Sequence, residues 1–254
     1  MCKPAVLFRI DHEISAKTGS VKSLVLCVAF LWPAIFAESA VVLTENFNYA
    51  DGPIVGATDS PWNHHSGANS NEMLVVSGKL EVSENLSEDI NATLSDSPYT
   101  TASGTILYSS FTINFSELPT PNGSYFAHFN SSSGRARIFA STTGAPSGFF
   151  RLGIGNGINA NATSGQLPIN LILGEIYFVV TRYDVASGLS TIWINPVAEC
   201  DPSATASDTT GPVTISEFCF RQAGNEGVMQ IDDLKIATSF AEVISSSPVT
   251  APTI

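Results

Sequence analysis

Residue types that support several common kinds of chemistry are scarce in this 254-residue chain. It has four cysteines, four histidines and 11 lysines plus arginines, and charged residues make up only 13% of it. No long stretch keeps the apolar period of 3.6 residues that a helical bundle needs. No Gly-x-Ser-x-Gly turn accompanies the histidines, so a serine-hydrolase triad is not indicated. What remains is rich in Ala, Ser, Thr, Gly and Asn, a composition that favours sheets joined by turns.

The first 40 residues differ from the rest. Lys22 precedes an apolar run over residues 24–37, which ends in small residues around Ala37 and Ala40. This pattern predicts a signal peptide over residues 1–39 with an extended polar n-region. The run is shorter than the ~20 residues that a membrane-spanning helix needs, and no later segment is long enough either. We therefore expect an exported protein, secreted or at the cell surface, whose mature chain does not span a membrane.

The chain beyond this leader is strongly acidic. Residues 40–254 hold seven Lys plus Arg against twenty Asp plus Glu, a net charge near −13. Nucleic acids and anionic membrane surfaces attract positively charged proteins, so neither is an expected partner. The carboxylates remain available for divalent cations, although solubility explains the acidity equally well.

Only Cys200 and Cys219 remain beyond the predicted leader. In an oxidising compartment they would form one disulfide closing a loop of about 20 residues, worth ~3 kcal/mol by the chain-entropy model. Two free buried thiols are the alternative. No histidine or third cysteine lies near them in sequence, so their spacing alone indicates neither metal nor nucleophilic chemistry.

Short runs of β-branched and aromatic residues alternate with turn residues from residue 41 onwards, which is typical of a sandwich of two packed sheets. Trp193 alternates with isoleucines in a strand that is apolar on both faces, so it is predicted to be buried. Residues 40–244 are expected to form one domain, and the Ser/Thr/Pro-rich residues 245–254 a linker or tail. The expected strands are residues 41–47, 73–76, 79–83, 105–115, 124–130, 136–141, 149–155, 170–173, 176–184, 189–195, 214–222 and 228–237.

Three groups of segments together resemble a known family. They are residues 45–52 followed by Trp62, residues 179–184 with 191–196 and 201–203, and residues 220–222 with 229–237. In combination they are similar to the concanavalin A-like lectin/glucanase jelly rolls of laminin-G (LamG) type in exported bacterial proteins, some of which carry PEP-CTERM sorting tails. The resemblance implies an all-β jelly-roll sandwich of two antiparallel sheets over about residues 41–244. It also implies a carbohydrate-binding or adhesive role, while the chain departs from the PEP-CTERM pattern in lacking that tail.

Catalysis is not expected from the carboxylates. Enzymes of this fold hydrolyse β-glucans with a Glu-x-Asp-x-x-Glu arrangement on one strand, and no such spacing occurs here. We therefore expect a non-catalytic module that binds a polysaccharide or cell-surface glycan, or that has a structural role. The alternative is a divergent glycoside hydrolase or polysaccharide lyase, and a hydrolase would need paired carboxylates about 5 to 9.5 Å apart in a groove.

Candidate sugar contacts come from aromatic rings and from side chains that hydrogen-bond hydroxyl groups. Trp62 is one such candidate. His128, Arg137 and Arg151 lie on three consecutive expected strands and would form a polar sheet face, with Phe126 on the same face as His128. Ordinary outward-facing strand residues are the alternative interpretation.

The adjacent pair His64-His65 is compatible with a transition-metal or sugar contact beside Trp62. Adjacent residues usually point apart, however, so a solvated loop is the simpler interpretation.

A structural Ca²⁺ is the expected metal, because jelly rolls of the resembled type often tie their first and last strands together with this ion. Asp51, in an Asp-Gly turn, and Asp233, in the closing strand, are the predicted oxygen ligands. Asp232 and Asp233 are consecutive, so only one of them can point inward from a strand. The alternative is an ordinary turn and a strand-end carboxylate that is already hydrogen-bonded.

Overall fold

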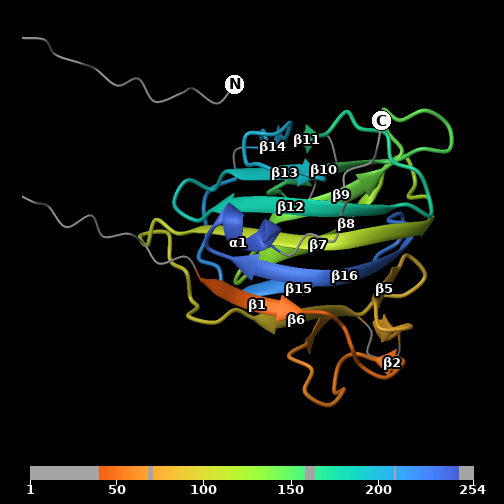
Figure 1. Ribbon diagram of the computed structural model, residues 1–254, viewed down its shortest axis with the longest axis horizontal. Coiled ribbons are helices and arrows are strands. Elements are labelled where there is room, and N and C mark those ends of the chain that lie inside the picture. The colour runs from red at the N-terminus through yellow and green to blue at the C-terminus, as the bar shows by residue number, and fades with distance from the viewer. Residues whose placement is uncertain (1–39, 68–70, 158–163, 209, 246–254) are drawn as a thin grey trace, which may run out of the picture. The chain divides into compact units, whose positions relative to one another are not determined.

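The computed structural model describes residues 40–67, 71–157, 164–208 and 210–245 (Figure 1). The predicted leader, residues 1–39, lies outside these residues, as does all but the first residue of the predicted tail. The described strands belong to two antiparallel sheets, so the predicted all-β jelly-roll sandwich is confirmed. None of the helical structure in the described ranges is long and apolar enough to cross a membrane.

The larger sheet has nine strands. They are β1 (Val41–Glu45), β2 (Gly52–Pro53), β4 (Leu74–Val75), β5 (Leu80–Ser83), β7 (Ile106–Glu117), β12 (Ile176–Asp184), β13 (Ser190–Ile194), β14 (Ala204–Thr205) and β16 (Val228–Ala237). The order is β14-β13-β12-β7-β16-β5-β4-β2. Strand β1 pairs with the last residues of β16, and strand β5 pairs with the first residues of β16. Two short strands therefore share one edge of this long strand.

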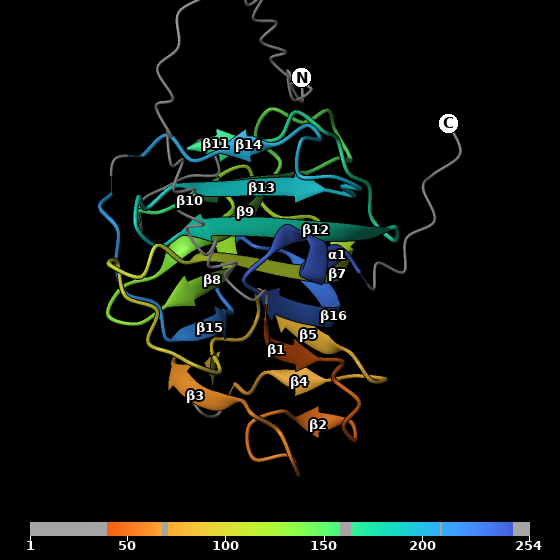
Figure 2. The ribbon, with the colours of Figure 1, turned by 60° about the vertical axis from the view of Figure 1, so that its left-hand side comes forward.

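The smaller sheet has seven strands. They are β3 (Asn63–Ser66), β6 (Asp89–Thr93), β8 (Ser124–Asn130), β9 (Arg135–Ser141), β10 (Arg151–Gly155), β11 (Gly165–Gln166) and β15 (Glu217–Phe220). The order is β11-β10-β9-β8-β15-β6-β3. Figure 2 shows β8 beside β15 and β3 toward the lower end of this sheet.

The main core lies between the two sheets and is built largely from phenylalanines. Phe111 of β7 contacts Phe126 of β8 and Phe218 and Phe220 of β15 edge to face, with ring centroids 6.3, 6.5 and 5.9 Å away. All four rings are fully buried. Burying one such side chain contributes ~1.5–3 kcal/mol, so this cluster holds the sheets together.

A second, smaller core lies on the other side of the nine-stranded sheet. There the helix α1 (Phe240–Ile244) packs across β7 and β16 (Figure 1). Phe240 meets Tyr108 and Trp193 edge to face, with ring centroids 5.9 and 5.6 Å away. The predicted burial of Trp193 is therefore confirmed, although the residue lies under the helix and not between the sheets.

Candidate functional site

The seven-stranded sheet has a polar outer face, by which we mean the side turned away from the nine-stranded sheet. Along its strands, Phe126, Ile138 and Phe218 point into the main core. Side chains that alternate with them point the other way and lie outside that core. The central residues of the outer face are Asn91, Tyr125, His128, Arg137, Phe139, Glu217, Cys219 and Arg221.

Tyr125 is the centre of this face. The guanidinium carbon of Arg221 lies 4.3 Å from the centre of its ring, and that of Arg137 lies 5.2 Å away. His128 and Phe139 contact the same tyrosine edge to face, with ring centroids 5.5 and 5.6 Å away. Two cations therefore make cation–π contacts with one half-buried aromatic ring, and such contacts are favourable because the π face of the ring is electron-rich.

Arg137 is a buried cation with incomplete polar contacts. Its side chain donates one hydrogen bond to the carbonyl of Asn156, while its Nε is buried without a hydrogen-bond partner. Burial lowers the pKa of Arg137 and the neighbouring Tyr125 opposes this change. A guanidinium nevertheless stays protonated at neutral pH. Within the described ranges, no carboxylate lies within 4.0 Å of it.

Arg221 also lacks an ion pair among the described residues. Its Nη1 donates to Ser124 Oγ at 2.9 Å and to the Tyr125 carbonyl at 3.3 Å. The buried carboxyl of Glu226 acts on it from a longer distance. Burial raises the pKa of Glu226 well above its ordinary value, against the opposing effects of the Ala223 amide and Arg221. Because Glu226 is held toward its neutral form, it compensates the charge of Arg221 poorly.

His128 is a neutral member of the face. Burial lowers its pKa to about 3, and the nearby Arg137, His65 and Arg221 lower it further, against the effect of the Phe129 carbonyl. Its Nδ1 lies 3.1 Å from that carbonyl oxygen. At neutral pH the imidazole is therefore uncharged and offers hydrogen bonding without adding positive charge.

The structure brings together two of the predicted sugar-binding residues, His128 and Arg137, but not Arg151. In the β9–β10 pair, Arg137 lies opposite Gly155 and Arg151 lies opposite Ser141. Four residues of strand separate the two positions, which corresponds to about 13 Å. The Nε of Arg151 donates to Asn170 Oδ1 at 2.8 Å, at the far end of the strand pair.

Tyr125 was not indicated by the sequence, because strict alternation places it on the face opposite His128. Strand β8 breaks that alternation with irregularities in its pairing to β9 between Tyr125 and Ala127 and between Ala127 and Phe129. The irregular register puts Tyr125 and His128 on one side and Phe126 in the core. The expectation that Phe126 shares the face of His128 is therefore wrong.

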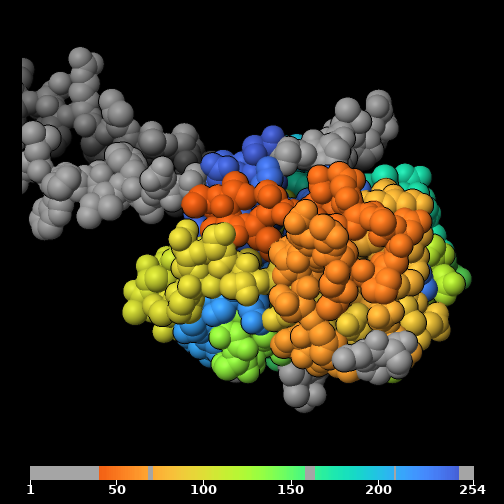
Figure 3. All heavy atoms as spheres, turned by 90° about the horizontal axis from the view of Figure 1, so that it is seen from below, coloured from red at the N-terminus to blue at the C-terminus, as the bar shows by residue number. Residues whose placement is uncertain are grey.

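The predicted sugar contact at Trp62 is also wrong. The indole is only 2% exposed and packs against Phe47 and Phe220, with ring centroids 6.2 and 5.3 Å away. Its Nε1 donates to Glu45 Oε2 at 3.2 Å. The physical reason is burial: the segment after β1, orange in Figure 3, covers this end of the sandwich, and the large apolar indole fills the space beneath.

The predicted disulfide is not formed. Cys200 is an exposed free thiol in the segment between β13 and β14, at the edge of the nine-stranded sheet. Cys219 is a buried free thiol in β15, a central strand of the other sheet. Proximity in sequence does not bring them together, because the chain crosses from one sheet to the other between them. The alternative of two buried thiols holds only for Cys219.

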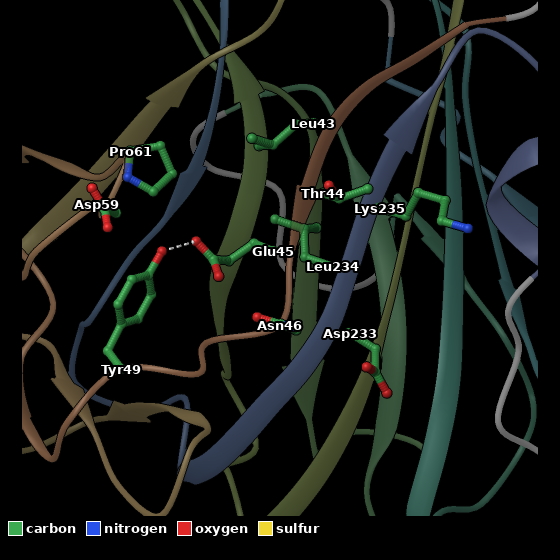
Figure 4. Close-up of a pocket in the computed structure, with 10 residues that line it drawn as sticks. All are labelled: Leu43, Thr44, Glu45, Asn46, Tyr49, Asp59, Pro61, Asp233, Leu234 and Lys235. Carbon is green, nitrogen blue, oxygen red and sulfur yellow. Dashed lines mark hydrogen bonds between the residues drawn. The ribbon is translucent and has the colours of Figure 1, made fainter.

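A pocket of about 440 Å³ opens between β1, β16 and the segment that follows β1 (Figure 4). Its inner wall is organised by Glu45, which accepts hydrogen bonds from the Phe47 amide at 2.8 Å and from the Tyr49 hydroxyl at 2.6 Å. Burial, followed by this contact with Glu45, raises the pKa of Tyr49. The carboxylate of Glu45 therefore holds the pocket wall in place.

The predicted Ca²⁺ ligands do not come together in this pocket. Asp233 lines it, but Asp51 does not, and Asp51 Oδ1 accepts the Ser77 amide at 2.7 Å. Asp233 is exposed in an irregular stretch of β16, with a positive φ of 54°, and the neighbouring Leu234 points inward instead. Ca²⁺ requires six to eight oxygen ligands, and this pair does not supply such a cage. A Ca²⁺ at Asp51 and Asp233 stays a prediction that this geometry does not support.

Similarity to known proteins was found in the comparison with solved structures. No family model matches the chain, and no curated protein matches it. A sialidase is 15% identical with a TM-score of 0.47, over 78% of this chain and 19% of the sialidase, so the chain spans about a fifth of that protein. Lectin II from Ulex europaeus is 16% identical with a TM-score of 0.47, over 79% of this chain and 100% of the lectin. The Lotus tetragonolobus seed lectin is 13% identical with a TM-score of 0.47, over 77% of this chain and 98% of the lectin.

Proposed function

We propose that this domain is an exported, non-catalytic carbohydrate-binding module that recognises an acidic polysaccharide outside the cell or at its surface. The binding site in this proposal is the outer face around Tyr125. The observation that carries it is the pair Arg137 and Arg221, which flank the same tyrosine without a carboxylate partner among the described residues.

A buried or half-buried guanidinium without an anion is costly, because desolvation of the charge is not compensated. A ligand carboxylate or sulfate would supply the missing charge, and the planar guanidinium binds such groups through two parallel hydrogen bonds. Arg137 offers a buried Nε without a hydrogen-bond partner, and Arg221 is more accessible. An acidic sugar therefore fits this site better than a neutral one.

The same cluster offers the other contacts that a sugar needs. Tyr125 is half-buried, and its ring holds the two guanidinium groups side by side at the site. His128, which is neutral, and Ser124 supply hydrogen bonds for hydroxyl groups. The chain as a whole has a formal charge of −12, so nonspecific attraction of a polyanion is not expected. Binding of a polyanion would therefore report on the local arginine pair.

The test compares polymers that differ only in charge. Isothermal titration calorimetry of the full chain with polygalacturonate and with its methyl ester should show binding of the acid form and at least ~10-fold weaker binding of the ester, because hydrogen bonds to charged groups are worth ~1.5–3 kcal/mol. Dextran sulfate and dextran give the matching comparison for sulfate. Equal affinity for charged and neutral forms would overturn the assignment of an acidic ligand.

Two arginine variants localise the site. Arg221→Gln should weaken binding of the acidic polymer by about 10- to 100-fold, from the loss of one charge-assisted contact. Arg151→Gln is the matched control, because it removes the same charge from the far end of the same sheet, and it should change the affinity less than 2-fold, as expected for a site ~13 Å away. Equal losses in the two variants would indicate general electrostatics instead of this site.

Cleavage of the polymer would contradict the non-catalytic part of the proposal. Size-exclusion chromatography of the polymer after long incubation with the protein distinguishes the two cases. An unchanged chain length supports a binding module, whereas shortening would favour the alternative of a divergent glycoside hydrolase or polysaccharide lyase.

A further inference from the structure

A second group of functional side chains lies on the outer face, next to the arginine–tyrosine cluster. A ring nitrogen of His65, a carboxylate oxygen of Glu217 and the sulfur of Cys219 all lie within 4.8 Å of one another. Within the part of the chain that the structure describes, this is the one group of three or more His, Cys, Asp or Glu residues with such close ligand atoms. Neither the predicted function nor the proposed sugar site uses it.

The sheet geometry fixes how the three residues meet. Glu217 and Cys219 are two residues apart in β15, so they point to the same side of the sheet. His65 comes from the edge strand β3, and β6 lies between the two strands. Residues that are far apart in sequence are thus held on one face by two sets of strand pairs.

We propose that His65, Glu217 and Cys219 bind a zinc ion, or another divalent transition metal that accepts sulfur, nitrogen and oxygen. Imidazole nitrogen, thiolate sulfur and carboxylate oxygen are the three protein ligand types of zinc. Zinc–ligand bonds of about 2.0–2.3 Å in a tetrahedron place the ligand atoms roughly 3.3–3.8 Å apart. The observed upper limit of 4.8 Å therefore requires side-chain movements of only about 1 Å.

The buried floor of the group carries an independent sign of a missing partner. Asn91 of β6 lies opposite Cys219 on one side and opposite Asn63 on the other, so it shares the face of the cluster. Its Oδ1 is buried and has no hydrogen-bond partner. Buried polar atoms are nearly always paired, so this oxygen is suited to a metal-bound water or to the metal itself.

The chain contains matched controls for both donor types. Cys200 is a second free thiol on the other sheet, and His64 is the neighbour of His65 but contacts Glu88 at 3.1 Å. If any thiol or imidazole of the chain could bind the metal, replacing Cys200 or His64 would weaken binding as much as replacing Cys219 or His65. The proposed site requires Cys219 and His65 specifically.

The test uses the full chain, stripped of metal by a chelator under reducing conditions. Titration with ZnCl₂ against a chromophoric competitor should give a site that Cys219→Ser and His65→Ala weaken at least ~100-fold, because each variant removes a directly bound ligand. Cys200→Ser and His64→Ala should stay within ~3-fold of the unchanged chain. Co²⁺ should produce the cysteine-to-cobalt charge-transfer absorption, and only Cys219→Ser should abolish this absorption among the cysteine variants.

Other outcomes would overturn the proposal. They are the absence of a zinc site in the unchanged chain, equal binding by the Cys219→Ser chain, or loss in the Cys200→Ser chain. Should Cys219→Ser unfold the protein, Glu217→Gln and the cysteine-to-cobalt absorption of the Cys200→Ser chain decide the question in chains whose circular dichroism is unchanged. Sugar affinity is measured on the same variants, so failure of the metal site and failure of the carbohydrate site remain distinguishable.

Discussion

His64 and His65 are adjacent in sequence, yet their side chains contact different parts of the protein. His64 Nδ1 lies 3.1 Å from Glu88 Oε1, whereas His65 lies beside Glu217 and Cys219. Successive residues of a regular strand point to opposite sides of the sheet, and the pairing of β3 with β6 is irregular between His64 and Ser66. His64 therefore contacts a buried carboxylate, whereas His65, at the next position, lies on the outer face of the seven-stranded sheet.

We expect His64→Ala to destabilise the metal-free protein by about 1–3 kcal/mol, because it leaves the nearly buried Oε1 of Glu88 without its partner. The other oxygen, Oε2, accepts the Met73 amide at 2.8 Å and cannot compensate. Urea unfolding at neutral pH measures the change.

His65→Ala is the control for this prediction. The residue is exposed, so its replacement should change the free energy of unfolding of the metal-free protein by less than about 0.5 kcal/mol. Equal effects of the two substitutions would contradict the different environments of the two side chains.

Trp62→Phe tests whether the indole of Trp62 serves in the core and not as a sugar contact. The substitution keeps an aromatic ring in the core but removes the indole N–H that Glu45 accepts. We expect a loss of about 1–3 kcal/mol in unfolding free energy, from reduced packing and one lost charge-assisted hydrogen bond. The affinity for acidic polymers should stay unchanged, because the ring is not at the proposed site. A selective loss of polymer binding in a stably folded variant would restore Trp62 as a ligand contact.

The buried carboxyl of Glu226 should make stability depend on pH. Burial raises its pKa well above the ordinary value of 4.5, while the Ala223 amide and Arg221 oppose this shift. Above pH 4.5 the unfolded chain has released a proton that the folded chain still holds, so the free energy of unfolding falls as the pH rises. The contribution is complete below pH 4.5 and is lost as the pH rises through the pKa of the folded state.

Glu226→Gln removes this titration. Urea midpoints measured at pH 4 and pH 8 should therefore fall less with increasing pH in the variant than in the unchanged chain. Two pH profiles that run parallel would show that Glu226 ionises in the folded protein as it does in the unfolded one.

Most of the fold could be predicted from the sequence, because strong alternation coincides with the long strands. Residues 176–184 and 228–237 were expected as strands and are β12 and β16 with the same bounds. Strand β6 (Asp89–Thr93) was missed, because Ile90 is its only large apolar residue and five residues are too short for its alternation to be distinctive. It pairs with β15 on one side and with β3 on the other. The expected strand at 170–173 is a single bridge from Leu171 to Phe150.

The candidate site was predictable only in part. Alternation alone placed His128 and Arg137 on one polar face, as the structure does. It could not place Tyr125 there, because the irregular pairing of β8 depends on its neighbour β9. Nor could it join His65 to Cys219, because their contact depends on the order of strands β15, β6 and β3, which local patterns do not specify.

The helix α1 should contribute to stability through one side chain. Phe240→Ala removes the ring that packs on Tyr108 and Trp193, and truncation of a buried Phe costs about 3–5 kcal/mol. Exposure of Trp193 should also shift its fluorescence to longer wavelength. Val197→Ala is a control, because Val197 is 75% exposed and its truncation should cost less than about 0.5 kcal/mol. A native emission spectrum and an unchanged urea midpoint for Phe240→Ala would mean that the helix is not docked on the sheet.

The two thiols should react at very different rates in the folded, metal-free protein. Cys200 is exposed, whereas Cys219 is buried and burial raises the pKa of its thiol well above the ordinary value, with Glu217 and Asp89 adding to the effect. Since the thiolate is the reactive form, iodoacetamide should label Cys200 first and Cys219 only after unfolding. Peptide mapping by mass spectrometry, with and without prior reduction, measures both sites. Resistance of both cysteines to labelling until a reductant is added would instead show the disulfide and overturn the free-thiol arrangement.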